Sequence, residues 1–232
     1  IEHMVATSHS RDMAVDLEAA VSRTGEILAV RGSVTQDLGS EEIYPPGFAM
    51  GLTAAGSITA PYRIPLQAIG VTAVVTNKTP SGAYRGFGLA EAVFAMERLI
   101  DKIAREIGRD SVSLRRDLLL RPEDLPYATP AGAIIDSGSH LQAFERAVQL
   151  GLDKVARARE QITDVHTRVG VGFANYVEGV VPTYYPTTGR FTNQESCAVR
   201  VDVDGSVIVS SSLQSMGQGV VSMIATLTAE AF

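Results

Sequence analysis

The sequence predicts an α+β fold, because strand-like and helix-like segments are grouped along the chain without a regular βαβ alternation. Three observations support this class. Residues 14–36 alternate between polar and apolar side chains as short strands do, and residues 89–107 repeat apolar side chains with the period of a helix. The last third of the chain returns to a period of two. No internal repeat or low-complexity tract interrupts this order.

The first elements are two strands at residues 14–19 and 27–34, which are expected to pair as antiparallel neighbours. Residues 38–66 are rich in Gly, Pro, Ser and Thr and contain no long periodic segment, so they predict a folded loop region. A β-branched strand is expected at residues 69–76. It is followed by a glycine-rich turn at residues 79–88.

The clearest helix is predicted from about residue 89 to residue 107, with Gly108 as its left-handed cap. Its charged side chains, Glu97 among them, are expected on the face opposite the apolar one. Asp101 and Arg105 have the spacing of an i,i+4 ion pair.

Two more helices are expected further along the chain. Asp110 is placed to cap a short one. The other opens after Ser139 and is expected to break at Gly151 and continue on a new axis.

Three prolines in residues 121–138 predict a linker there. The expected organisation is therefore a first subdomain at 1–120, a linker at 121–138 and the start of a second subdomain at 139–232.

The second part of the chain is expected to be built mainly from strands. A strand is predicted at 169–177, a loop at 182–192, and a hairpin from 196–202 and 207–211 around an Asp-Gly turn. A helix follows the turn at residues 215–219.

Composition excludes several classes of function. The chain has 232 residues and a net charge of −6, and its 20 Lys and Arg residues are scattered, so no basic surface for nucleic acid or an anionic membrane is expected. No apolar run is long enough to span a bilayer. The one cysteine, Cys197, excludes an internal disulfide or a cysteine-bound iron–sulfur cluster within these residues. Cys197 is expected to be a small buried residue in a reducing, cytoplasmic protein.

Two glycine-rich turns are candidate binding loops. The first, residues 82–88, combines flexible backbone before a helix with Arg85 and the aromatic side chains of Tyr84 and Phe87. Such a turn can bring backbone N–H groups and a guanidinium to an anion, although a tight turn with a solvated Arg85 explains the same residues. The second turn is Gly217-Gln218-Gly219, whose amide can donate and accept hydrogen bonds.

Other candidates are weaker. Glu178 follows the predicted strand at 169–177 and is either a site carboxylate or a solvated strand end. The four histidines lack metal-ligand spacing, and no Gly-x-Ser-x-Gly elbow is present. The glycines near Phe87 do not fit a dinucleotide-binding fingerprint, because the third small residue is missing.

In combination, these motifs resemble the molybdopterin-binding large subunit of the molybdenum hydroxylases, the family of xanthine dehydrogenase, aldehyde oxidoreductase and aerobic carbon monoxide dehydrogenase. The resemblance covers nearly the whole chain, and its specificity comes from the order of many short matches. They are Glu2-His3-Met4 with Arg11, residues 61–65, Thr76-Asn77, Pro80, residues 82–88 with Glu91 and Glu97-Arg98, Gly108-Arg109-Asp110 with Arg115, residues 136–138, 170–174 and 204–207, and residues 216–219.

The resemblance implies roles for the two loops. Arg85 and Gly86 would lie beside the molybdenum, with the Arg85 backbone contacting an oxo ligand. Gly217, Gln218 and Gly219 would contact the cofactor, and Gln218 would hydrogen-bond the pterin or the oxygen ligands near it. Tyr84, Phe87 and Glu178 are expected to line the substrate pocket. No metal ligand is expected from the chain itself.

Departures from the family pattern refine these expectations. The family's Gly-Gly-Gly-Phe-Gly-Gly loop and its Gly-x-Gly-Glu segment, which carries the catalytic base, do not occur in these residues. No catalytic residue is therefore expected in this chain; the base would lie beyond Phe232, and both ends read as cut from a longer polypeptide. Gly86 stands where carbon monoxide dehydrogenases have a cysteine, and Thr53 stands where purine oxidisers have an arginine.

The implied enzyme hydroxylates an aldehyde or an N-heterocycle with oxygen from water. Its cofactor would be molybdopterin, in the cytosine dinucleotide form, with [2Fe-2S] clusters and FAD on partner subunits or domains. An iron–sulfur subunit, an FAD subunit and a small-molecule substrate are the expected partners, in an oligomeric complex. Alternatives are a carbon monoxide dehydrogenase-like subunit, a split-gene subunit completed by a partner chain, and a non-catalytic assembly module. The isolated chain is expected to be inactive.

Overall fold

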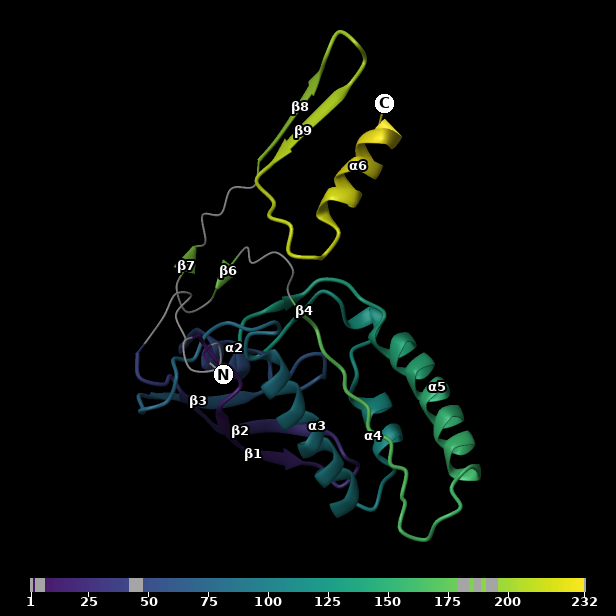
Figure 1. Ribbon diagram of the computed structural model, residues 1–232. Coiled ribbons are helices and arrows are strands. Elements are labelled where there is room, and N and C mark those ends of the chain that lie inside the picture. Colours follow the sequence, from purple (N-terminus) through teal and green to yellow (C-terminus); the bar gives the residue numbers. More distant parts are fainter. Residues whose placement is uncertain are drawn as a thin grey trace. The chain divides into compact units, whose positions relative to one another are not determined.

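A computed structural model of the chain describes residues 7–41, 48–178 and 196–231, together with Glu2 and the backbone of residues 184–185 and 189–190 (Figure 1). The chain divides into two compact units, residues 1–180 and residues 181–232. Among the described helices, none combines the length and apolar character needed to cross a membrane.

Unit 1 is built on a three-stranded sheet in the order β1-β2-β3. β1 (Met13–Val21) pairs antiparallel with β2 (Ile27–Asp37), and β2 pairs in parallel with β3 (Gln67–Val74). Side chains along β1 alternate between half-buried and exposed, so one face of the sheet turns toward the core. These three strands confirm the two strands expected from the period-two pattern and the β-branched strand expected at residues 69–76.

The parallel pairing of β2 and β3 requires a crossover, and a helix occupies it. α2 (Phe48–Ser57) has buried Met50, Gly51, Ala54 and Ala55. The expectation of a loop throughout residues 38–66 was therefore wrong. Residues 48–57 of this segment form a helix of uncharged, mostly small residues, which lacks a polar face because it packs against both β2 and α3.

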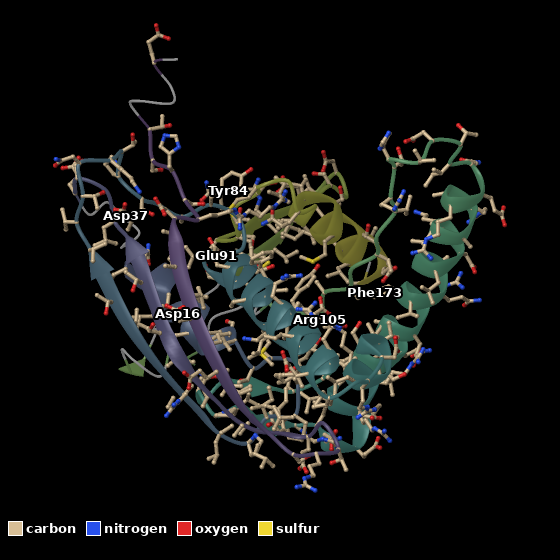
Figure 2. The ribbon with its side chains drawn as sticks, turned by 90° about the horizontal axis from the view of Figure 1, so that it is seen from below. Asp16, Asp37, Tyr84, Glu91, Arg105 and Phe173 are labelled. Carbon is tan, nitrogen blue, oxygen red and sulfur yellow. The ribbon has the colours of Figure 1, made fainter. Side chains whose placement is uncertain are left out.

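α3 (Leu89–Glu106) lies against the sheet and starts where the glycine-rich turn ends (Figures 1 and 2). Its left-handed end at Gly108 (φ +67°) is as expected. Two side chains differ from the expectation. Glu97 is buried on the inner side of the helix, and Asp101 pairs with Arg115 at 2.9 Å instead of with Arg105.

α4 (Ser111–Leu118) begins at the Asp110 cap, whose carboxylate accepts a hydrogen bond from Ser113 N at 2.7 Å. α5 (His140–Glu160) is one continuous helix, so the break expected at Gly151 was wrong. A Cβ at Gly151 would lie 3.1 Å from the Phe173 ring. The glycine therefore serves close packing against Phe173, which also meets Phe144 edge-to-face with ring centroids 5.8 Å apart.

Residues 121–138, the expected linker, contain the short elements η1 (Pro122–Asp124), β4 (Tyr127–Ala128) and β5 (Ile134–Ile135) within unit 1. Ile135 is buried, and the Tyr127 hydroxyl donates to the Ile64 carbonyl at 3.1 Å. The division into subdomains at 1–120 and 139–232 stays a prediction.

Residues 169–177 are not a strand, which corrects the expectation. Their period-two pattern is nevertheless real, because Phe173, Asn175 and Val177 are half-buried between exposed neighbours. The segment is anchored by side chains on the helices, as when Asn175 N donates to Glu97 Oε1 at 2.7 Å. Alternating burial without a ladder partner explains why the sequence pattern was misleading.

Unit 2 contains the expected hairpin, β8 (Cys197–Val201) and β9 (Val207–Ser211), and the expected helix α6 (Val220–Ala231). Every residue of β8 is exposed, including Cys197, so the expectation of a buried cysteine was wrong. The loop expected at 182–192 lies outside the described residues except for β6 (Tyr184–Tyr185) and β7 (Gly189–Arg190), which pair with each other.

Candidate active-site loops

The first loop reaches α3 through three successive residues with positive φ: Gly86 (+96°), Phe87 (+43°) and Gly88 (+92°). Phe87 N donates to the Tyr84 carbonyl at 3.2 Å, and Leu89 N donates to the Gly86 carbonyl at 2.8 Å. A left-handed turn of this kind favours glycine, and Phe87 adopts it at a cost in backbone strain.

Gly88 also meets a steric requirement. A Cβ at this position would lie 2.1 Å from the Met50 carbonyl oxygen of α2. The start of α3 therefore approaches the backbone of α2 so closely that no side chain fits between them. This contact fixes where the loop ends and the helix begins.

Arg11 holds the same loop from the start of the chain. Its Nη2 donates to the Arg85 carbonyl at 2.8 Å, and its guanidinium carbon lies 5.4 Å from the centre of the Tyr84 ring. Its Nη1 lies 3.8 Å from Glu91 Oε2, in the first turn of α3. Figure 2 shows Tyr84 and Glu91 near this end of α3, with Arg105 in the last turn.

The loop has the charge and exposure of an anion-binding surface. Tyr84 and Arg85 are exposed, while Gly86 and Phe87 are half-buried. The Arg85 guanidinium makes no hydrogen bond or ion pair with the residues that the structure describes. The loop region thus combines two guanidinium groups and a helix N-terminus with a single carboxylate, Glu91, which lies opposite Arg11. This balance of charge suits an anionic ligand with several oxygen atoms.

The second loop, in unit 2, is open. Gly217 and Gly219 have φ values of +92° and +83°, and a Cβ at either position would meet no described atom within 4 Å. The Gln218 amide bonds to its own loop, where Oε1 accepts from Met216 N at 2.5 Å and Nε2 donates to the Gln214 carbonyl at 2.9 Å. The amide must turn away from these partners before it can bond to a ligand.

The structure places the sequence candidates in both units. Tyr84, Arg85, Gly86 and Phe87 share one loop of unit 1, and residues 217–219 form the loop before α6 in unit 2. Glu178 is an exposed residue of unit 1 that follows Asn175 and makes no hydrogen bond or ion pair with described residues. Thr53, the position compared with the purine oxidisers, is half-buried in α2.

Sequence reasoning missed a buried polar cluster beneath α3. Glu97 accepts hydrogen bonds from Arg115 Nε and the Tyr62 hydroxyl, each at 2.7 Å, and Asn175 Nδ2 donates to the Tyr62 oxygen at 2.8 Å. Burial, reinforced by the charge of Glu97, raises the pKa of Tyr62 far above its ordinary value. Burial opposes the charge of Arg115, but Glu97 outweighs it and keeps the Arg115 pKa above the usual value.

A helical projection would have found Glu97, because it stands three residues before Ile100 and seven before Ala104, both buried. Arg11 was found in the sequence only as one of the family-motif matches. Its contact with the loop carried no signal of its own, because Arg11 lies outside any periodic segment and acts across 74 residues of sequence. No group of three or more His, Cys, Asp or Glu side chains that could hold a metal ion occurs among the described residues.

Comparisons with known proteins identify the family. Two models described as molybdopterin cofactor-binding domains match residues 1–119 and 146–232. The chain is 33% identical to the 6-hydroxypseudooxynicotine dehydrogenase complex subunit gamma of Paenarthrobacter nicotinovorans, over 99% of this chain and 28% of the relative. It is 31% identical to the carbon monoxide dehydrogenase large chain of Afipia carboxidovorans, over 94% of this chain and 28% of that protein.

A solved structure gives the same result. Quinoline 2-oxidoreductase from Pseudomonas putida 86 matches with a TM-score of 0.77 and 29% identity, over 94% of this chain and 28% of the other. The chain thus spans a little more than a quarter of these relatives. The α+β fold class is confirmed by the elements of the structure and by these neighbours. The chain belongs to the molybdenum hydroxylase family, as part of its molybdopterin cofactor-binding large subunit.

Proposed function

We propose that this chain contributes the two cofactor-facing loops of a molybdenum hydroxylase that oxidises an N-heterocyclic substrate. The observation that carries the proposal is the loop at residues 82–88, where Arg85 and the neighbouring Arg11 bring positive charge to the half-buried Gly86 and Phe87 at the start of α3. A phosphate-bearing, multi-oxygen cofactor matches that charge.

Arg85 and Gly86 are assigned to the molybdenum end of the cofactor, and Gly217, Gln218 and Gly219 to its pterin part. The open space at Gly217 and Gly219 allows a ligand to approach the backbone directly. The cofactor supplies the two-electron oxidation of the substrate and the transfer of oxygen from water. The form proposed for the cofactor is the cytosine dinucleotide, which carries a second phosphate and a base.

Tyr84 and Phe87 are assigned to the substrate pocket together with Glu178. The two aromatic rings offer flat apolar surfaces on which a heteroaromatic ring can stack. Relatives named for the oxidation of nicotine derivatives and quinoline favour this class over aldehydes. Glycine at position 86, where the carbon monoxide dehydrogenases have a cysteine, argues against carbon monoxide as the substrate.

No residue of this chain is assigned as the catalytic base, which we place in the Gly-x-Gly-Glu segment of a full-length subunit. An iron–sulfur subunit and an FAD subunit are proposed as the electron-accepting partners in an oligomeric complex. Names such as "complex subunit gamma" and "large chain" describe relatives that work in assemblies of several chains.

The test uses the full-length subunit co-expressed with its partners in a host that makes the cofactor. Molybdenum content is measured by plasma mass spectrometry, and dye reduction is followed with quinoline, nicotine, benzaldehyde and carbon monoxide. We expect close to one molybdenum per subunit and oxidation of a heterocycle with ¹⁸O incorporated from labelled water. Turnover of carbon monoxide alone would favour the carbon monoxide dehydrogenase alternative, and absence of molybdenum would favour an assembly module.

A matched pair of variants tests the role of Arg85. Loss of a charge-assisted hydrogen bond in Arg85→Gln should lower molybdenum retention during dialysis about tenfold. Arg105→Gln is the control, because Arg105 is also exposed and lies in the last turn of α3, the helix that follows the loop. Equal retention in the two variants would contradict a contact of the Arg85 guanidinium with the cofactor. A second polypeptide that is required for loading would identify a split-gene subunit.

A further inference from the structure

Arg11 has a backbone conformation that needs an explanation. It is one of two described non-glycine residues with positive φ, at +75°, and the other is Phe87 in the loop that Arg11 contacts. An L-residue adopts this conformation at a cost, which persists only where surrounding contacts compensate for it. The compensating contacts of Arg11 are all made with the loop at residues 82–88 and the first turn of α3.

These contacts use three different parts of one guanidinium. Nη2 bonds to the Arg85 carbonyl, Nη1 faces the Glu91 carboxylate, and the flat face lies over the Tyr84 ring. A lysine has one compact ammonium group and cannot make the three contacts from a fixed plane. The Glu91 side chain is largely buried, and its Oε2 accepts no hydrogen bond from described residues, so its charge is directed to Arg11.

The bond to the Arg85 carbonyl orients a peptide plane of the loop. In a trans peptide, the carbonyl of one residue and the N–H of the next point in opposite directions. With the Arg85 oxygen held by Arg11, the N–H of Gly86 is therefore turned away from Arg11. Because Gly86 has no side chain and positive φ, nothing else in the residue itself fixes that plane.

We propose that Arg11 is a positioning residue that fixes the Arg85–Gly86 peptide plane for contact with the cofactor. The inference rests on the proposed function, because the loop is assigned to the cofactor there. Arg11 touches the loop and not the ligand. Its loss changes the geometry with which the loop meets the cofactor, while the overall fold of unit 1 is retained.

The first experiment needs no cofactor. The full-length subunit is produced in a host that does not make the cofactor, and trypsin cleavage after Arg85 is timed by mass spectrometry. We expect Arg11→Gln to accelerate this cleavage about tenfold, because removing a charge-assisted bond of about 1.4 kcal/mol releases the loop. The cleavage rate of Arg11→Lys should fall between those of the wild type and Arg11→Gln. Arg31→Gln is the control, since it removes an exposed arginine that pairs with Glu18 at 2.6 Å.

The second experiment uses the loaded complex. Arg11→Gln should shift the hyperfine pattern of the Mo(V) electron paramagnetic resonance signal and lower kcat more than it raises KM, with partial rescue in Arg11→Lys. Unchanged cleavage after Arg85 together with an unchanged Mo(V) signal would overturn the proposal. If the wild-type subunit loads no molybdenum, the proposed function fails, while the cleavage rates still decide whether Arg11 holds the loop.

Discussion

The two glycine-rich loops look alike in sequence but are held in place differently. The loop at residues 82–88 is fixed by distant parts of unit 1, with Arg11 lying 74 residues away and the backbone of α2 packed against Gly88. The loop before α6 is held by its own Gln218, which bonds to residues two and four positions earlier. A glycine pattern therefore predicts a turn, whereas the tertiary contacts decide how rigid the turn is.

The largest effect is expected from the support beneath α3. Arg115→Met should lower the free energy of unfolding of unit 1 by about 4 kcal/mol, because it leaves the buried Glu97 carboxylate without its cation. Chemical denaturation, monitored through the hydrogen exchange of the α3 backbone amides, measures this change in the free energy of unfolding. In unit 2, Arg200→Met removes an exposed pair with Asp202 and should cost less than about 0.5 kcal/mol. Similar costs in the two variants would contradict the difference between the units.

The next effect compares two glycines that both precede helices. Gly88→Ala should destabilise α3 by about 3 kcal/mol, from left-handed strain and from overlap with the Met50 carbonyl. Gly219→Ala has the strain but no overlap, so a cost of about 1 kcal/mol is expected for α6. Hydrogen exchange of the two helices in each variant checks the ranking, and equal losses would be incompatible with the close approach at Gly88.

The pKa values of one carboxylate in each unit, Asp37 in unit 1 and Asp204 in unit 2, also compare distant with local contacts. The Lys78 ammonium, with the Thr76 hydroxyl and the Gly39 N–H, lowers the pKa of Asp37 to about 2. Because this folded-state pKa lies below the ordinary value near 4, Asp37 stabilises unit 1 above about pH 4, and that contribution is lost as the pH falls through 2. Lys78→Met should return the Asp37 pKa toward its ordinary value.

The corresponding group in unit 2 is Asp204, whose pKa is lowered first by the N–H of Ser206 in its own turn, at 2.9 Å. Carbon-detected NMR titration of the wild type and of Lys78→Met should show a shift at Asp37 and none at Asp204. An Asp37 pKa that is unchanged in Lys78→Met would show that the hydrogen bonds from Thr76 and Gly39 are sufficient to lower it.

The smallest effect is expected at Gln218. Gln218→Ala removes two exposed hydrogen bonds within the loop and should cost about 0.5 kcal/mol. The Met216 amide should then exchange about twice as fast, while α3 amides remain unchanged. Gln214→Ala keeps both bonds, because Gln214 contributes only its backbone carbonyl, and should leave the Met216 exchange rate as it is.

The parts of the fold that follow a period were predictable from the sequence. The strands β1 to β3, the helix α3 and the β8–β9 hairpin all carry their own patterns of apolar residues or turn residues. α2 was missed because its helical state depends on packing: Gly51 N donates to Gln36 Oε1 at 2.7 Å, and the helix packs against β2, β3 and α3. Because α2 contains no charged residue, its sequence shows no clear contrast between a polar and an apolar face.

The candidate site was predictable only in its loops. Glycines and Arg85 mark the first loop in the sequence, but the neighbours that hold it, Arg11 and Met50, are brought there by the fold. At Gly151 the sequence predicted a helix break that the structure does not contain. Glycine is typical of helix ends, but here it leaves room for the ring of Phe173 to pack against α5. In each case a distant side chain or backbone outweighs the local preference.

The buried Glu97 carboxylate also has a consequence for the order in which unit 1 folds. Its bond to Asn175 N closes 78 residues of chain, and the bond from Asn175 Nδ2 to the Tyr62 hydroxyl closes 113. Closing such long loops is entropically expensive, so contacts of this separation form late. We therefore expect α3 and α4 to join first through Glu97 and Arg115, and the segment at residues 169–178 to dock onto them as a final step.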